Sequence, residues 1–286
     1  MPLTVRRSIE GIAERFREAG LTFGHGYDSA WDEAVALVLG ITGLPDDRTV
    51  LRRRVTRAHL ERIEALARRR VQERVPLAYL LGRSPFAGHD FLIEPGVVIP
   101  RSPIGALIRA RFRPWLRQPP TRILDLCCGS GCIGIAAALE FPHARLDLAD
   151  VDPRAVDLAE RNVGRYGLEA RAAVCRSDLF TGLPAERWDL ILSNPPYVDR
   201  SDMRSLPPEY RHEPALGLAG GTDGLDLVAR MLDALPARLA AGGLFVCEVG
   251  GSAPALRARF PRLPFLWPEL PDGGEGVFLL WREDLA

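Results

Sequence analysis

The sequence lacks lysine and long apolar runs, and it has few cysteines and aromatic residues. No apolar stretch in its 286 residues reaches the roughly 18 that span a bilayer, so we expect neither a transmembrane segment nor a membrane partner. Arg6 and Arg7 lead into Ser8-Ile9-Glu10 and not into an apolar stretch, so no signal peptide is expected. The five cysteines form no even-numbered disulfide framework, which favours reduced thiols and a cytoplasmic location.

The remaining composition is ordinary for a globular enzyme. Hydrophobic residues make up 47% and charged residues 26% of the chain, and the length suits one large or two modest domains. Cys127, Cys128 and Cys132 do not have the spacing of a common zinc site, so we predict no metal.

Charge is distributed unevenly, and every basic residue is an arginine. Residues 1–117 carry 20 arginines and 13 acidic residues, a net charge of +7, whereas residues 118–286 carry 17 and 24, a net charge of −7. The basic N-terminal half could dock an anionic partner such as RNA or an RNA-associated protein. Solvated helix faces and a genome that favours arginine explain the same charges without a partner.

The hydrophobic pattern begins with helical periodicity. Residues 1–75 predict a helical domain, with helices capped by Ser8 and Asp28 and a third helical region from Thr49. Residues 76–101 then predict a β-hairpin linker around Glu94-Pro95-Gly96. Its expected strands are 86–93 and 96–99.

Helices and strands alternate from residue 102 to residue 286, which predicts an α/β fold with a mainly parallel sheet covered on both faces. The expected strands are 122–126, 145–150, 171–175, 188–193, 244–249, 264–270 and 276–281. The last two would form an antiparallel hairpin at the end of the sheet. The expected helices are 102–116, 131–140, 154–166, 223–240 and 253–260.

Asn194-Pro195-Pro196-Tyr197 follows a predicted buried strand and carries unusual chemistry. Prolines have no backbone N–H and cannot continue a sheet ladder, so carbonyl oxygens near this turn lack intramolecular partners. The Asn194 side chain adds another acceptor and Tyr197 adds a flat ring. Such acceptors beside a ring suit a planar –NH2 group, either an amide or the exocyclic amine of a base. A proline-rich turn capped by an aromatic residue is the alternative interpretation.

A second motif predicts a strand, a small-residue loop and a helix over residues 123–134. Gly129, Ser130 and Gly131 would let the loop backbone approach a ligand closely, and the helix N-terminus offers unpaired N–H groups. The spacing Gly129-x-Gly131-x-x-Gly134 also matches a dinucleotide fingerprint, which by itself is weak support for a nicotinamide enzyme.

Two carboxylates follow the next two predicted strands. Asp150 could accept hydrogen bonds from both ribose hydroxyls of a nucleoside. Asp178 could accept from an adenine amino group, with Leu179 or Phe180 against the ring. The carboxyl ends of parallel strands meet at one edge of a sheet, so these residues should lie beside the small-residue loop.

The loop Asp125-Leu126-Cys127-Cys128-Gly129-Ser130-Gly131 and the later Asn-Pro-Pro-Tyr together resemble the class I S-adenosylmethionine-dependent amino methyltransferases. The resemblance implies a Rossmann-like, mainly parallel seven-stranded sheet with a terminal antiparallel hairpin, and S-adenosylmethionine as cofactor. The residues expected to bind it are Asp125, Cys127, Cys128, Gly129, Ser130, Gly131, Asp150, Asp178, Leu179 and Asn194. Two of them have alternative interpretations: Asp150 as a helix N-cap, and Asp125 as a buried strand-end carboxylate that orders the loop.

The N-terminal half and residues 99–104 narrow the resemblance to the protein glutamine methyltransferases of the HemK/PrmB group. Pro100-Arg101-Ser102-Pro103-Ile104 is the form seen in the branch that acts on ribosomal protein L-three of the large subunit, whereas the release-factor branch reads Pro-Arg-Pro-Glu-Thr. Further matches are residues 86–91, 221–226 and 248–250. The likeness covers residues 75–282, and residues 1–75 match only in helical character. Cys128 and Asp152 depart from the usual Thr and Ser without removing an acceptor.

The resemblance implies direct methyl transfer to a glutamine amide without a covalent enzyme intermediate. Asn194, Pro195 and Tyr197 are the expected catalytic residues, because the Asn194 oxygen and the Pro195 carbonyl would hold the amide protons. The expected substrate-binding residues are Asn194, Pro195, Pro196, Tyr197 and Arg101. Residues 1–75 would recognise the protein substrate, and rRNA would contact the basic half. No base is identified, and His212 is expected to be a surface histidine.

Two other functions stay open. The same turn could hold a nucleic-acid base, although base flipping usually needs more stacking aromatics than a chain with 7% aromatic residues supplies. A non-catalytic ribosome-assembly or RNA-binding factor could retain the fold, but the intact loop and turn argue against it.

Overall fold

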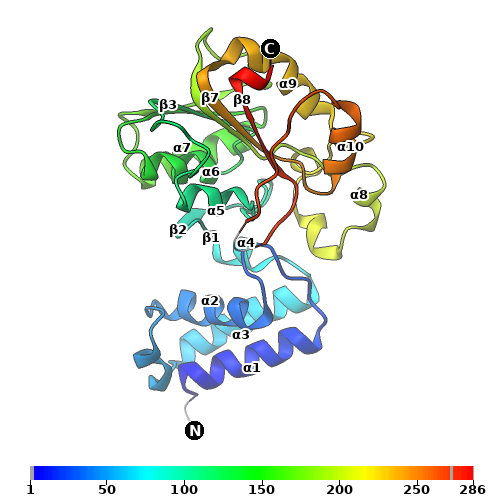
Figure 1. The fold of residues 1–286 in the computed structure, drawn as a ribbon. Helices are drawn as coiled ribbons and strands as arrows, with labels where there is room; N and C mark the ends of the chain where they lie inside the picture. The colour runs from blue at the N-terminus through cyan, green and yellow to red at the C-terminus, as the bar shows by residue number, and fades with distance from the viewer. Residues whose placement is uncertain (1–2, 271–272, 286) are drawn as a thin grey trace.

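The computed structural model describes residues 3–270 and 273–285 of the chain. Figure 1 shows a group of N-terminal helices at one end of the molecule and a sheet flanked by helices at the other. A short hairpin lies where the two parts meet. No helix in these described ranges is both long and apolar enough to cross a membrane.

The N-terminal helical region has its own buried core. It contains α1 (Val5–Glu18), α2 (Ala30–Thr42), the short 3₁₀ helix η1 (Arg48–Arg52) and α3 (Arg57–Gln72). Their apolar faces meet in one cluster whose fully buried members include Phe16, Leu37 and Ile63. The helical prediction for residues 1–75 is therefore confirmed.

The predicted helix starts in this region were wrong. The capping side chains are Thr4, Ser29 and Thr56, each of which accepts from the backbone N–H three residues ahead in the first turn of α1, α2 and α3. Ser8 instead lies buried inside α1, because an antiparallel bridge between Thr4 and Arg54 starts the helix earlier.

The hairpin exists, but it lies earlier than predicted. The short helix α4 (Leu77–Leu81) ends at Gly82, and β1 (Arg83–Phe86) pairs antiparallel with β2 (His89–Leu92). Ala87 and Gly88 both have positive φ, of 49° and 88°, which is the geometry of a tight two-residue turn. Residues 96–99 form no strand and instead line the cavity described below.

The main sheet has six strands in the order β5-β4-β3-β6-β7-β8. Its strands are β3 (Arg122–Leu126), β4 (Arg145–Asp150), β5 (Ala172–Arg176), β6 (Trp188–Ser193), β7 (Leu239–Glu248) and β8 (Val277–Trp281). All neighbours are parallel except β7 and β8. The chain starts at β3, moves outward through β4 and β5, and then returns to the other side of β3 as β6, so the order reverses between β3 and β6.

The predicted seventh strand, residues 264–270, is absent from the described part of the chain. Only Leu266 reaches the sheet, where it exchanges backbone hydrogen bonds of 3.1 and 2.8 Å with Leu279 of β8. Pro261, Pro264 and Pro268 interrupt this stretch and cannot donate to a ladder. The terminal hairpin is thereby reduced to one bridge, and the antiparallel end of the sheet is the β7–β8 pair.

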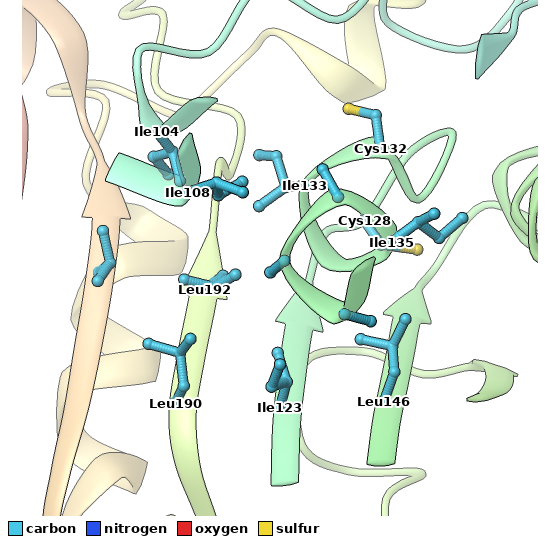
Figure 2. Close-up of a cluster of buried hydrophobic side chains, with 14 of the residues drawn as sticks. Ile104, Ile108, Ile123, Cys128, Cys132, Ile133, Ile135, Leu146, Leu190 and Leu192 are labelled. Carbon is cyan, nitrogen blue, oxygen red and sulfur yellow. The ribbon is translucent and has the colours of Figure 1, made fainter. Parts of the chain in front are cut away.

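Helices cover both faces of the sheet. One face carries α5 (Ile104–Arg109), α6 (Cys132–Glu140) and α7 (Pro153–Arg165), and the other carries α9 (Asp226–Arg238) and α10 (Ala253–Arg259). Figure 2 shows the first face, with Ile133 and Ile135 from α6 above the strand residues Ile123, Leu146 and Leu190. Alternate residues of each strand enter opposite cores, as expected for a sheet buried on both sides.

Two further boundaries differ from the prediction. The helix predicted to reach residue 116 ends at Arg109, because Arg111 and Phe112 take positive φ values and Phe112 turns into the core. The strand predicted from residue 244 starts at Leu239, so Gly242 lies inside it. The remaining short helices are α8 (Asp202–Ser205), η2 (Pro208–His212), η3 (Ala215–Gly217), η4 (Gly250–Ser252) and η5 (Arg282–Leu285).

Candidate active site

A cavity of about 720 Å³ lies at the carboxyl ends of β3, β4 and β6, where the strand order reverses. Open parallel sheets bind ligands at this position, and the volume is within the range of small-molecule sites. Its walls come from the loops after these strands, from residues 96–102, and from residues 202–218 of the segment that follows the Asn-Pro-Pro-Tyr turn.

The loop after β3 presents its backbone to the cavity. Cys127, Gly129 and Gly131 all have positive φ, of 56°, 55° and 77°. The Cys128 N–H donates to the Ala149 carbonyl at 3.1 Å, which ties the loop to the end of β4. Burial raises the pKa of the Cys127 and Cys128 thiols, so both stay neutral near pH 7. The loop therefore offers close backbone approach and no charge.

Asp150 places a carboxylate beside this loop. Its Oδ2 accepts from the Gly129 N–H and its Oδ1 from the Asp152 N–H, each at 2.9 Å. Each carboxylate oxygen has a second lone pair, and the residue lines the cavity. Burial raises the pKa of Asp150, although the two backbone donors oppose the shift. A fixed carboxylate acceptor beside the small-residue loop fits the ribose of a nucleoside cofactor.

Asp125 takes a different place from the one expected of a cofactor contact. It is fully buried, and within the described part of the chain it is not one of the residues that line the cavity. Its Oδ2 accepts from the Gly134 N–H at 2.8 Å, while its buried Oδ1 has no partner among the described residues. Burial raises its pKa to about 8, so the carboxyl is mostly neutral at pH 7. It orders the start of α6 from behind the loop.

Asp178 and Leu179, although adjacent in the sequence, lie in different environments. Asp178 lines the cavity, but its half-exposed carboxylate pairs with Arg230 at 2.8 Å. Leu179 has a positive φ of 50° and is buried in the core under the opposite face of the sheet. Gly131, like Leu179, lies outside the described cavity lining, and its αL conformation starts α6.

The Asn-Pro-Pro-Tyr turn follows β6 and lines the cavity beside the small-residue loop that follows the neighbouring strand β3. The Ser193 hydroxyl donates to the Leu126 carbonyl at 2.8 Å and fixes the end of β6 to that of β3. No described residue forms a hydrogen bond with the Asn194 side chain or donates to the Pro195 carbonyl. Both acceptors therefore remain available on the cavity wall, as the sequence predicted for the prolines.

Tyr197 is held by a residue that sequence reasoning gave no role. Its hydroxyl donates to Glu248 Oε1 at 2.6 Å. Gly250 allows the ring to pack against backbone, because a Cβ at that position would lie 2.5 Å from Tyr197 Cε2. Burial and the Glu248 carboxylate raise the pKa of Tyr197, so the phenol stays protonated. Glu248 stood within a matching stretch of sequence, but nothing local indicated its partner.

Arg101 lines the cavity on the same side as the turn, and its guanidinium pairs with Glu213 at 2.7 Å. It also lies over the ring of Tyr210, 5.2 Å from the ring centroid. Sequence reasoning missed both Glu213 and Tyr210, since neither belongs to a motif. His212 is partly exposed, as expected of a surface histidine. Its Nε2 lies 2.9 Å from the carbonyl oxygen of Glu73, the residue after α3, so His212 connects two segments of the chain.

Comparison with known proteins agrees with this geometry. Residues 113–206 match the model of the Methyltransferase small domain family. The fold is similar to that of the catalytic domain of hMettl16 in complex with MAT2A 3′UTR hairpin 6, with a TM-score of 0.53 and 17% identity over 78% of this chain and 81% of that chain. At this identity the likeness concerns the fold alone. The strand order, with a glycine loop facing an Asn-Pro-Pro-Tyr turn, defines a class I methyltransferase.

Two curated relatives are similar over nearly their whole length. The chain is 45% identical to the ribosomal protein uL3 glutamine methyltransferase of Bordetella pertussis, over 99% of this chain and 96% of the relative. It is 48% identical to the protein of the same name from Xanthomonas campestris pv. campestris, over 95% and 89%. The chain belongs to the family of ribosomal protein uL3 glutamine methyltransferases.

Proposed function

We propose that this chain transfers a methyl group from S-adenosylmethionine to the side-chain amide nitrogen of a glutamine in ribosomal protein uL3. One observation carries the proposal: Asn194 and Pro195 line the cavity at the edge of the sheet that also presents Gly129 and Asp150, and neither the Asn194 side chain nor the Pro195 carbonyl has a hydrogen-bond donor among the described residues. The named activity of the two curated relatives supports the protein acceptor.

The cofactor end of the cavity fits S-adenosylmethionine. Asp150 would accept from the ribose hydroxyls, Asp178 from the adenine amino group, and the backbone of residues 127–130 would border the methionine part. When bound, the cofactor would supply an electrophilic methyl group on a sulfonium: the S–CH3 bond breaks as the N–CH3 bond forms, S-adenosylhomocysteine leaves, and the nitrogen gives up one proton. Asp125, Gly131 and Leu179 support this end from behind the cavity surface.

The acceptor end solves the problem that an amide nitrogen is a poor nucleophile. Its lone pair is delocalised into the carbonyl, so the chain must hold the nitrogen and polarise it. The Asn194 oxygen and the Pro195 carbonyl would each accept a hydrogen bond from one amide N–H, and the Tyr197 ring would pack against the amide plane. Glu248 keeps that ring in place through the hydroxyl. Such positioning can contribute roughly 7–11 kcal/mol to lowering a barrier, and fixed dipoles add to it.

A methyl-transfer assay tests this function directly. Purified enzyme, labelled S-adenosylmethionine and ribosomal protein uL3 should give a labelled protein band that survives nuclease and disappears with protease. Mass spectrometry should then place one methyl group on a glutamine. Peptide chain release factors and nucleic acid are offered in parallel, and preferential labelling of either would overturn the acceptor assignment. The Asn194→Ala variant serves as the inactive control.

The N-terminal helical region supports recognition of an acceptor that associates with rRNA. Exposed Arg52, Arg53 and Arg54 lie next to exposed Arg7, because Thr4 bridges to Arg54, and none of the four pairs with a described carboxylate. We propose that residues 1–75 recognise the substrate and that these arginines contact rRNA phosphates. The five free cysteines support a reducing compartment, the cytoplasm.

Salt-dependent binding to an rRNA fragment tests this contact. Changing Arg52, Arg53 and Arg54 together to Gln should weaken binding and lower the slope of log K against log salt by roughly one per lost phosphate contact. The control changes Arg6 and Arg57 to Gln, since Arg6 already pairs with Glu10 and Arg57 with Glu61. Equal losses in the two variants would contradict the proposed surface.

A further inference from the structure

A segment after the Asn-Pro-Pro-Tyr turn connects the cavity with the N-terminal helical region. Residues 207–214 contribute Pro207, Tyr210 and Pro214 to the cavity wall. The same segment carries two glutamates, Glu209 and Glu213, whose side chains are completely shielded from solvent. Buried carboxylates are costly unless they are paired, so their partners identify what this segment holds together.

Glu213 gathers three partners from distant parts of the chain. It accepts from Arg101 Nη1 at 2.7 and 3.0 Å and from the Ile99 N–H at 3.4 Å. His25 Nε2 lies 3.2 Å from Oε1, and the His25 side chain is also fully buried, although the contact does not have hydrogen-bond geometry. Burial alone would raise the pKa of Glu213, but His25 and Arg101 outweigh it and lower the pKa. The carboxylate is therefore ionised, and it pins the Arg101 guanidinium in one position.

Arg101 keeps free donors after making this pair. All of its hydrogen bonds to described residues, to Glu213 and to the Ile99 carbonyl, use Nη1. Nε and Nη2 have no such partner, the side chain is 24% exposed, and the residue lines the cavity. Tyr210 supports the guanidinium from one side. Tyr197 is near enough that its phenol and the guanidinium shift each other's pKa.

We propose that Arg101 is an acceptor subsite that binds a backbone carbonyl oxygen of the peptide next to the target glutamine. Glu213 and His25 are the positioning residues that aim it. A guanidinium with unused N–H groups can only donate, so its ligand must present an acceptor such as a carbonyl oxygen. The surrounding walls are apolar and suit a peptide better than a nucleic-acid backbone; they are formed by Leu206, Pro207, Pro214, Leu216 and Leu218.

This subsite makes the helical region part of the acceptor end. His25 lies between α1 and α2, so one of the three partners of Glu213 comes from that region. Through His25, the helical region therefore contacts the carboxylate that holds Arg101. The inference rests on the proposed function, since the ligand of the subsite is the protein acceptor of that reaction.

Glu209 supplies a matched control on the same segment. Its buried carboxylate accepts from the Thr22 N–H at 3.0 Å and pairs with Arg70 at 3.3 Å and Arg74 at 3.2 Å. None of these partners lines the cavity. Glu209 therefore fastens the segment to the helical region just as Glu213 does, but without touching a residue that could meet the acceptor.

The experiment compares Glu213→Gln, Glu209→Gln and Arg101→Lys in the full-length enzyme. For each variant we would measure the free energy of unfolding, the Kd for S-adenosylmethionine by calorimetry, and kcat and KM with ribosomal protein uL3. Both glutamine variants should lose stability. Only Glu213→Gln and Arg101→Lys should raise the KM for uL3, by about tenfold or more. Arg101→Lys loses a charge-assisted hydrogen bond to the acceptor, and Glu213→Gln no longer holds the guanidinium in position. The Kd for S-adenosylmethionine should stay near the wild-type value in all three.

Three outcomes would overturn the subsite. Equal KM increases in Glu209→Gln and Glu213→Gln would mean that the segment acts only as a structural clamp. An unchanged KM in Arg101→Lys, which keeps the charge and should fold even if Glu213→Gln does not, would remove Arg101 from acceptor binding. Competitive inhibition by polyuridylate in the wild type that is lost in Arg101→Lys would assign the guanidinium to phosphate. Failure of the wild-type enzyme to methylate uL3 would instead refute the proposed function itself.

Discussion

The two ends of the cavity are built in different ways. The cofactor end is assembled from loops that directly follow adjacent parallel strands, and its hydrogen bonds join neighbouring strand ends, as between Gly129 and Asp150. The acceptor end is assembled from segments far apart in the sequence. Arg101 and Glu213, for example, are 112 residues apart.

Under the proposed function, this difference separates the residues that bind the cofactor from those that select the substrate. Any chain with the right strand–loop–helix units will bring Gly129 and Asp150 together, because the sheet topology forces their loops to meet. The proposed acceptor end has an additional contact with the helical region, which joins Arg101 to His25 through Glu213. A fold can thus keep one cofactor end and change its acceptor end.

The sharpest test of this separation is Asn194→Ala. We expect turnover to fall by about 10²- to 10³-fold, because one fixed acceptor for the amide protons is lost at the reacting atom. The Kd for S-adenosylmethionine, measured by calorimetry, should remain close to the wild-type value. Normal turnover in a purified assay would remove Asn194 from the reaction, and a large loss of cofactor affinity would show that the two ends are not independent.

The converse variant is Asp150→Ala at the cofactor end. Loss of hydrogen bonds to a charged group should raise the Kd for S-adenosylmethionine by about 10- to 100-fold, while the KM for the protein acceptor stays unchanged. Asp178→Asn is the comparison, since its half-exposed carboxylate already pairs with Arg230, and its effect should be smaller. A larger effect for Asp178 than for Asp150 would reverse the assignment.

Gly134→Ala tests the packing behind the cofactor loop. A Cβ there would lie 2.7 Å from Leu148 Cδ2 and 2.8 Å from Asp125 Cβ, so overpacking should lower the free energy of unfolding by about 1–3 kcal/mol in urea denaturation. Gly11→Ala is the control, because a Cβ in that exposed turn of α1 meets nothing within 4 Å. It should be neutral or stabilising. Equal destabilisation by both changes would contradict the role of close packing.

The last expected effect is a pH dependence of stability from Asp125. Its pKa of about 8 in the folded protein exceeds the ordinary carboxyl value, so the folded state binds more protons than the unfolded state between those limits. The stabilisation is complete below the unfolded pKa and is lost as pH rises through about 8, with a slope of at most about 1.4 kcal/mol per pH unit. Asp125→Asn should flatten this part of the stability–pH curve, measured by urea denaturation between pH 6 and pH 9. An identical curve for both proteins would show that Asp125 is ionised.

The sequence predicted the fold well where local signals agree. Alternation of strands and helices located every strand of the main sheet to within a few residues at most ends, since hydrophobic periodicity and turn residues act over short distances. It failed at residues 264–270, where apolar residues suggested a strand but prolines allowed one bridge only. It also misplaced the hairpin, because a positive-φ turn at Ala87 and Gly88 is not obvious from the residue types.

The same distinction holds at the site. The residue types alone determined a loop for close backbone approach, carboxylates at strand ends, and a turn with spare carbonyls beside a ring. Only the tertiary structure decided between the two roles that the sequence left open for Asp125, anchored Tyr197 to Glu248, and joined Arg101 to Glu213 and His25. The physical reason is that turn and strand chemistry depends on neighbouring residues, whereas burial and pairing of charges depend on which distant segments the packed fold brings together.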